Sequence, residues 1–356
     1  MKKLFLAAAP SLVLLALSAA IHAQPSALEQ LWSIPPTSRD YMSTNNNERG
    51  VAYNPVTGHV LVVSRYSGNP TMHILDRNTG ADLGTVAVPT NIVTGGTFAL
   101  SMIGVGADGA IYGANLTVAS STTPLKVYRW ANEGATPTIA YSGDPGPGPR
   151  WGDTFDVRGS GVTTQILLGS RTNTIAALLT TADGTVFAPS VINTTGVSGG
   201  DFGLGIAFGA GNTFWGKGSS ATTLQFMRLS GGAPIQSYTT AAFTNVFSNI
   251  ALDPANNLLA AISIATPDRI LLYDIAKSQS ASNSPVLLEA KVLPTDFANI
   301  NATGSADFGD GKLFVLDTNN GLIAYRVTAV PEPTIIALSA VAAGWLFCGR
   351  GRKVRK

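Results

Sequence analysis

The chain has 356 residues, of which 45% are hydrophobic and only 12% are charged. This apolar content excludes a disordered chain, and the length allows one large domain or two small ones. The net charge of +2 arises at the two ends, because residues 1–23 and 329–356 hold 7 of the 23 basic residues but only one of the 21 acidic ones. The central chain therefore has a net charge of −4, which argues against a nucleic-acid-binding protein.

The N-terminus has the three parts of a secretory signal peptide. Lys2 and Lys3 precede an apolar run over residues 4–20, and small residues lead to a cleavage point between Ala23 and Gln24. A retained membrane helix is the alternative, but the run is short and polar sequence follows it directly. We therefore expect residues 1–23 to be removed on export through the inner membrane.

The middle of the chain, residues 24–328, predicts an all-β fold built from a repeated unit. Short runs of β-forming residues alternate with turns rich in Gly, Asn, Asp and Pro, and helical periodicity is nearly absent. Each unit begins with a strand, a tight turn and a second strand, followed by a third strand and, in most units, a fourth. The repeat is anchored at Ala52, Ile103, Phe155, Ala207, Ala251 and Ala306. The spacing averages about 51 residues, which is typical of the blades of a β-propeller.

The sixth unit ends after three strands, at Val327, while a spare strand over residues 28–34 precedes the first unit. Pairing the spare strand with the last unit closes the ring and removes a sheet edge. We therefore predict a six-bladed propeller with N-terminal closure. A seventh blade within residues 132–162 and a pair of β-sandwiches are the alternatives. The pattern resembles extracellular propellers of the NHL and YVTN types, although no diagnostic motif fixes the family.

In such a ring, the long loops that lead into the first strand of each blade gather around one end of the central channel. Loops on a rigid scaffold often carry function, so we expect the binding face there. Its candidate ligand residues are Arg49, Arg65, Trp151 and Arg171. The arginines, together with Arg39, would bind carboxylates or sulfates, and Trp151 would stack on a sugar ring. The alternatives are ion pairs with neighbouring acids and a Trp packed between blades.

Four oxygen-bearing residues stand close to the starts of predicted first strands: Glu48, Asp153, Asp201 and Asn249. Such oxygen ligands suit a hard cation, so calcium is the cofactor that this set would hold. The arrangement loosely resembles the metal centre of lactonase-type six-bladed propellers, which implies a metal-dependent hydrolase as the rival function. Apart from this ion, the residues call for no cofactor and show no catalytic motif.

The C-terminal segment, residues 329–356, has three parts. Pro331, Glu332 and Pro333 precede an apolar stretch over residues 334–348, which contains the only cysteine, Cys348. A basic tail follows, with Arg350, Arg352, Lys353, Arg355 and Lys356. The apolar stretch is just long enough to enter a bilayer, and the basic tail would stay on the cytoplasmic side.

This tripartite segment resembles the PEP-CTERM sorting signal of Gram-negative bacteria. The resemblance implies recognition by an exosortase, transient insertion in the inner membrane through residues 334–348, and delivery to the cell surface or extracellular matrix. It also implies an association with exopolysaccharide and biofilm. A permanent tail anchor is the alternative. We expect a non-enzymatic binding or structural protein whose partner is an extracellular polysaccharide or an envelope protein, and a purely structural spacer is a further alternative.

Overall fold

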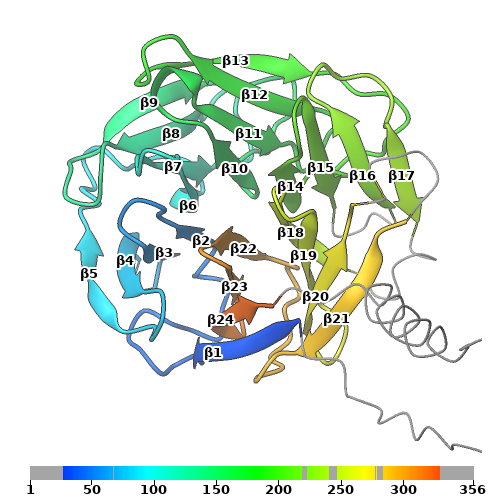
Figure 1. Cartoon of the computed structure of the whole chain (residues 1–356). Coiled ribbons are helices and arrows are strands. Elements are labelled where there is room, and N and C mark those ends of the chain that lie inside the picture. Colours follow the sequence, from blue (N-terminus) through cyan, green and yellow to red (C-terminus); the bar gives the residue numbers. More distant parts are fainter. Residues whose placement is uncertain are drawn as a thin grey trace, which may run out of the picture.

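The computed structural model describes residues 27–66, 68–218, 223–239, 247–276, 278 and 284–328. Six four-stranded antiparallel sheets stand around a central channel, as Figure 1 shows. This arrangement is a six-bladed β-propeller and confirms the predicted fold. Residues 132–162 contain the outer strand of the second blade and the inner strand of the third, so no seventh blade lies there.

The strands follow each blade from the channel outwards. Blade 1 comprises β2 (Gly50–Tyr53), β3 (His59–Ser64), β4 (Thr71–Asp76) and β5 (Asp82–Val86). Blade 2 comprises β6 (Phe98–Val105), β7 (Ile111–Leu116), β8 (Leu125–Trp130) and β9 (Thr138–Gly143). Blade 3 comprises β10 (Phe155–Arg158), β11 (Gln165–Gly169), β12 (Ala176–Thr181) and β13 (Phe187–Ile192), with the short 3-10 helix η1 (Gly161–Thr163) between β10 and β11.

The second half of the ring repeats the same order. Blade 4 comprises β14 (Gly205–Phe208), β15 (Thr213–Lys217), β16 (Thr223–Arg228) and β17 (Gln236–Thr239). Blade 5 comprises β18 (Phe247–Asp253), β19 (Leu258–Ser263), β20 (Arg269–Asp274) and β21 (Val286–Val292). Blade 6 comprises β22 (Gly304–Gly309), β23 (Lys312–Asp317), β24 (Gly321–Val327) and, as its outer strand, β1 (Leu28–Ile34).

The ring closes where β1 pairs with β24. The antiparallel register runs from Leu28 opposite Val327 to Ile34 opposite Leu322, with a bulge between Gln30 and Trp32. The two strands lie side by side in Figure 1. The spare N-terminal strand therefore completes blade 6, as predicted from the sequence.

The hydrophobic core lies between neighbouring blades. Within the described residues, the buried apolar side chains form six clusters, and each cluster joins two adjacent blades. For example, Tyr112 of blade 2 packs edge-on against Phe187 of blade 3, with 5.5 Å between ring centroids. Consecutive side chains of a strand point to opposite faces, so the apolar run of β3 serves two junctions: Val60 and Val62 pack towards blade 6, and Leu61 and Val63 pack towards blade 2.

Two opposite blade junctions use acidic side chains to satisfy inner-strand amides that no sheet partner reaches. The Asp156 carboxylate of blade 3 accepts a 2.6 Å hydrogen bond from the Phe208 amide of blade 4. The Asp307 carboxylate of blade 6 likewise accepts a 2.8 Å bond from the Tyr53 amide of blade 1. Burial raises the pKa of Asp156 to about 6 and that of Asp307 to about 7, and the charge of Asp156 contributes to the rise at Asp307.

The two ends of the chain lie outside the described residues. These ends contain the predicted signal peptide with its cleavage point between Ala23 and Gln24, the motif over residues 331–333, the apolar stretch over 334–348 and the basic tail. In the part that the structure describes, no helix has the length and apolar character needed to cross a bilayer.

Candidate functional site

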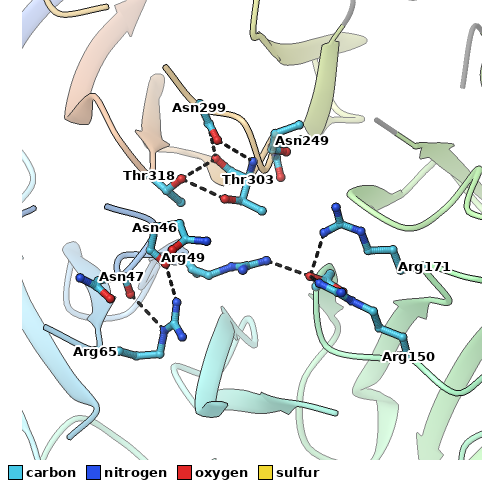
Figure 2. Close-up of polar contacts among 12 residues, drawn as sticks. Asn46, Asn47, Arg49, Arg65, Arg150, Arg171, Asn249, Asn299, Thr303 and Thr318 are labelled. Carbon is cyan, nitrogen blue, oxygen red and sulfur yellow. Dashed lines mark hydrogen bonds and ion pairs between the residues drawn. The ribbon is translucent and has the colours of Figure 1, made fainter. Parts of the chain in front are cut away.

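The inner strands of the propeller all begin at one end of the channel, which we call the mouth; we call the opposite end the base. Arg49 stands immediately before β2, and Asp153 stands two residues before β10. Figure 2 shows Arg49 with other polar side chains of the mouth. Charged side chains therefore gather at the end of the propeller where the binding face is predicted.

Three arginines converge on the Asp153 carboxylate. Its Oδ1 accepts hydrogen bonds from Arg49 Nη2 at 2.8 Å, Arg150 Nη2 at 2.9 Å and Arg171 Nη1 at 3.1 Å. Its Oδ2 accepts one from Arg150 Nε at 2.6 Å. The Asp153 side chain is fully buried and that of Arg49 is 3% exposed, whereas Arg150 and Arg171 keep 31% and 24% of their side-chain surface. Arg150 and Arg171 are thus the two arginines on Asp153 whose side chains reach solvent.

The loop that carries Arg150 and Asp153 is fixed by backbone contacts. The amide and carbonyl groups of Trp151 pair with those of Thr117 at 3.0 Å in both directions. Gly152 follows with φ of +93°, and a Cβ atom there would lie 1.9 Å from the Asn115 carbonyl oxygen. Only glycine fits this close approach, so the loop holds Asp153 at a set position.

Arg65 is the fourth member of the arginine cluster, which we define as Arg49, Arg65, Arg150 and Arg171. Its guanidinium donates to the carbonyl oxygens of Asn46 and Asn47, the latter at 3.2 Å from Nε. It also lies over the Phe98 ring, 3.3 Å from the centroid. Arg65 therefore has neutral partners.

The cluster carries more positive charge than its partners neutralise. Burial lowers the pKa of Arg49, and the neighbouring charges of Arg171 and Arg150 lower it further, against the opposing effect of Asp153. Burial also lowers the pKa of Arg65 to about 10, with the charge of Arg49 as the next cause. A bound anion would relieve this repulsion, because it would place negative charge beside crowded cations.

The acidic residues near the cluster compensate only part of this charge. Burial would raise the pKa of Asp153, but the bond from Arg150 and the charges of Arg49 and Arg171 bring it below the usual value, so this carboxylate stays ionised. Burial raises the pKa of Glu48 to about 7, and its oxygens accept bonds from Ser43 and Ser64. Near neutral pH, Glu48 is therefore only partly ionised.

The opposite side of the mouth, from blades 5 and 6, carries polar side chains that bond one another, and Asn299 Nδ2 also donates to Asp317 Oδ2 at 3.1 Å. Asn249 Nδ2 donates to the Ala302 carbonyl at 3.0 Å, and the Thr303 and Thr318 hydroxyls lie 2.9 Å apart. Asn299 Nδ2 donates to the Thr303 carbonyl at 2.7 Å. In Figure 2 the four arginines of the cluster lie apart from Asn249, Asn299, Thr303 and Thr318, across the mouth.

The structure corrects two expectations for the ligand face. Trp151 is fully buried in the core between blades 2 and 3, so it is not available to stack on a sugar. The backbone of Trp151 pairs with that of Thr117 in the mouth loop, and its ring packs into the core between these two blades. Arg39 lies apart from the cluster and pairs with Asp82 on the outer strand of blade 1.

The predicted oxygen set does not form a cation site. Asp153 faces three guanidinium groups, and Asp201 Oδ2 accepts bonds from Gln225 Nε2 at 2.9 Å and from the Ser198 amide at 3.0 Å. Glu48 is held by serines, and Asn249 by the Ala302 carbonyl. Among the described residues, no three His, Cys, Asp or Glu side chains are grouped so as to hold a metal ion. Each of the four predicted oxygen groups is therefore engaged by partners within the protein.

Arg150 and the polar residues Asn299, Thr303 and Thr318 were not among the predicted site residues. The spacing of Arg150 and Asp153, three residues apart after a run of Pro and Gly, was the one available signal for Arg150. Asn299, Thr303 and Thr318 carry no such signal, because they come together only when blade 6 forms.

Comparisons with known proteins agree on the fold. A family model described as a domain of unknown function, DUF4623, matches residues 43–159, which span blades 1 and 2 and the inner strand of blade 3. The crystal structure of a DUF4623 family protein from Bacteroides eggerthii is similar, with 16% identity, a TM-score of 0.58, and coverage of 82% of this chain and 76% of that one. No curated protein has a significant sequence match.

Two further solved structures show the same architecture. A protein of unknown function from Bacteroides thetaiotaomicron is 12% identical with a TM-score of 0.53, covering 85% of this chain and 74% of that one. Virginiamycin B lyase from Staphylococcus aureus is also 12% identical with a TM-score of 0.53, covering 83% of this chain and 99% of that one. At these identities the likeness concerns the propeller fold alone.

Proposed function

We propose that this protein is an exported propeller that binds an anionic ligand at its mouth, with the carboxylates of an acidic extracellular polysaccharide as the expected partner. The observation that carries the proposal is the set of three guanidinium groups on one carboxylate, with Arg65 beside them. Arginine forks bind carboxylates in two-point geometry, and the partial exposure of Arg150 and Arg171 gives a ligand access to such donors.

The binding role requires no catalytic group, and the described histidines lie outside the cluster. His59 Nδ1 is 2.8 Å from Glu133 Oε2, and His73 stacks on Tyr41 with 3.6 Å between ring centroids. Both are engaged elsewhere in blade 1 and its neighbour. This arrangement favours a binding protein over a hydrolase that would use a histidine base.

Arg171→Gln is expected to weaken the binding of an oligoguluronate by roughly tenfold to a hundredfold, because it removes one charge-assisted hydrogen-bond donor. Arg326→Gln is the matched control, since Arg326 pairs with Glu29 on blade 6 and is 56% exposed. Titration calorimetry would measure both affinities, with a neutral glucan oligosaccharide as the ligand control. Equal losses in the two variants, or equal binding of the neutral glucan, would contradict the proposal.

The location is proposed from the resemblance of the C-terminal segment to the PEP-CTERM signal, with an exosortase as the partner that recognises it. Glu332→Ala, or deletion of residues 350–356, is expected to leave full-length protein in the inner membrane. Cell fractionation with immunoblotting would measure this, with Glu29→Ala as a control on an exposed carboxylate of the body. Unchanged delivery to the surface would rule out the sorting role.

A further inference from the structure

A pocket of about 380 Å³ opens on the mouth side of blade 1. Its wall is formed by residues of the segment 37–45, which leads from β1 to β2, and by Tyr66, which stands two residues after β3. This volume lies within the usual range of small-molecule pockets. Tyr66 is 45% exposed, so the pocket combines an open aromatic ring with a largely polar segment of chain.

Backbone contacts hold the wall of the pocket in place. The Thr37 amide donates to the Met42 carbonyl at 2.9 Å, which closes the first turn of the segment. Further along, Asn319 Nδ2 of blade 6 donates to the Thr44 carbonyl at 2.6 Å. Because these bonds lie within the protein, a ligand does not have to order the wall when it binds.

The side chains of the pocket offer hydrogen-bonding groups and one negative charge. Arg39 is neutralised by Asp82, and its guanidinium also donates to the Gly80 carbonyl at 2.8 Å. In the part of the chain that the structure describes, no hydrogen bond or ion pair engages the side chains of Asp40, Thr44 or Asn45. An ionised aspartate accepts hydrogen bonds from hydroxyl groups but repels a second carboxylate. The pocket therefore favours a neutral ligand that carries hydroxyl groups.

The pocket adjoins the arginine cluster along the chain. Tyr66 follows Arg65 directly, and Asn45 precedes Asn46, whose carbonyl oxygen accepts a hydrogen bond from Arg65. Figure 2 shows Arg65 and Asn46 on one side of Arg49, with the other arginines of the cluster on the opposite side. A ligand that reaches both the pocket and the far arginines must therefore extend across the mouth, as an oligosaccharide can.

We propose that the pocket is a subsite for a neutral sugar residue, which stacks on Tyr66 and exchanges hydrogen bonds with Asp40, Thr44 and Asn45. A pyranose ring presents C–H groups to an aromatic face and hydroxyl groups at its edge, so this lining suits it. The inference rests on the proposed function and narrows its ligand to a heteropolysaccharide in which neutral sugars alternate with uronates. The arginine cluster takes a uronate, and the pocket takes a neutral residue of the same chain.

Titration calorimetry of the full-length chain tests this with two probes of equal length. Glucuronate alternates with N-acetylglucosamine in a hyaluronan hexasaccharide, whereas every residue of hexaguluronate is acidic. Tyr66→Ala is expected to weaken the binding of the hyaluronan probe roughly threefold to tenfold, because it removes the stacking surface, and Tyr66→Phe should bind as the native protein does. Ile139→Ala is the matched control, since Ile139 is 46% exposed on β9. Equal affinities of Tyr66→Ala and Ile139→Ala for the hyaluronan probe would overturn the proposal.

A charge variant tests the preference for a neutral residue. Asp40→Asn is expected to strengthen the binding of hexaguluronate severalfold, because it removes the repulsion between the pocket and a uronate. The hyaluronan probe should gain no such benefit, so the ratio of the two affinities changes. Glu29→Gln, which removes an exposed negative charge on β1, is the control and should leave that ratio as it is. A native ratio in Asp40→Asn would reject the assignment of a neutral sugar to the pocket.

These outcomes are separable from those of the anion-binding experiment. Arg171→Gln should weaken the binding of both probes if the arginine cluster takes a uronate. A loss in Arg171→Gln without one in Tyr66→Ala would reject the subsite and leave the proposed function in place. A loss in Tyr66→Ala without one in Arg171→Gln would support the pocket and reject the anion site, and no binding of either probe would overturn both.

Discussion

Asp153→Ala is expected to lower the free energy of unfolding by about 3–5 kcal/mol, because it leaves the buried Arg49 without its carboxylate and three guanidinium groups in mutual repulsion. Glu29→Ala is the control, since it breaks an exposed pair with Arg326 and should cost about 1 kcal/mol or less. Denaturant unfolding followed by circular dichroism measures both values. If Asp153→Ala lowered the free energy of unfolding no more than Glu29→Ala does, Asp153 would not be needed to offset repulsion among the arginines.

The same variant also offers a test by rescue. Acetate or formate can enter the space that the Asp153 side chain leaves, and ligand that binds only the folded state raises stability. We therefore expect acetate to stabilise Asp153→Ala more than the native protein at equal ionic strength, with chloride as the comparison salt. Equal stabilisation of the two proteins would contradict a demand for negative charge at this position.

The native protein is expected to lose stability as the pH rises from 5 to 8. Burial raises the pKa of Asp307 to about 7 and that of Asp156 to about 6, so the folded state binds protons that the unfolded chain has already lost. Because the folded-state pKa lies above the unfolded one, the penalty appears above pH 4 and is complete near pH 7. Thermal unfolding at a series of pH values measures the slope.

Asp307→Asn is expected to remove about 2–4 kcal/mol of the stability that the native protein loses as the pH rises, because each pKa unit corresponds to about 1.4 kcal/mol. The Asn oxygen still accepts the Tyr53 amide, so the junction is kept. Asp156→Asn is the companion variant and should reduce the slope less, because the pKa of Asp156 rises only to about 6. A slope in Asp307→Asn that equals the native slope would contradict this account of the blade junctions.

The fold could be predicted because its signals are local and repeated. Each blade carries a strand, a turn and a second strand within a few residues, and six copies of this pattern expose the period. The closure was also readable, since a last unit of three strands and a spare strand over residues 28–34 leave one simple pairing.

The site could be predicted only in part, because its contacts join distant segments. The positions of Arg49 and Arg171 in the mouth loops followed from the blade order, but their shared partner Asp153 lies 104 and 18 residues away from them. Trp151 stands in a loop rich in Pro and Gly, which suggests exposure. Trp151 is buried because its loop pairs with Thr117 of blade 2, a contact that the sequence around Trp151 does not indicate.

The most direct test of an anion site at the mouth is NMR of the arginine side-chain Nε–Hε groups during titration with oligoguluronate. We predict saturable shifts for Arg150 and Arg171, with little change at Arg326 on blade 6. Shifts absent from Arg150 and Arg171, or equal at Arg326, would contradict the proposed function.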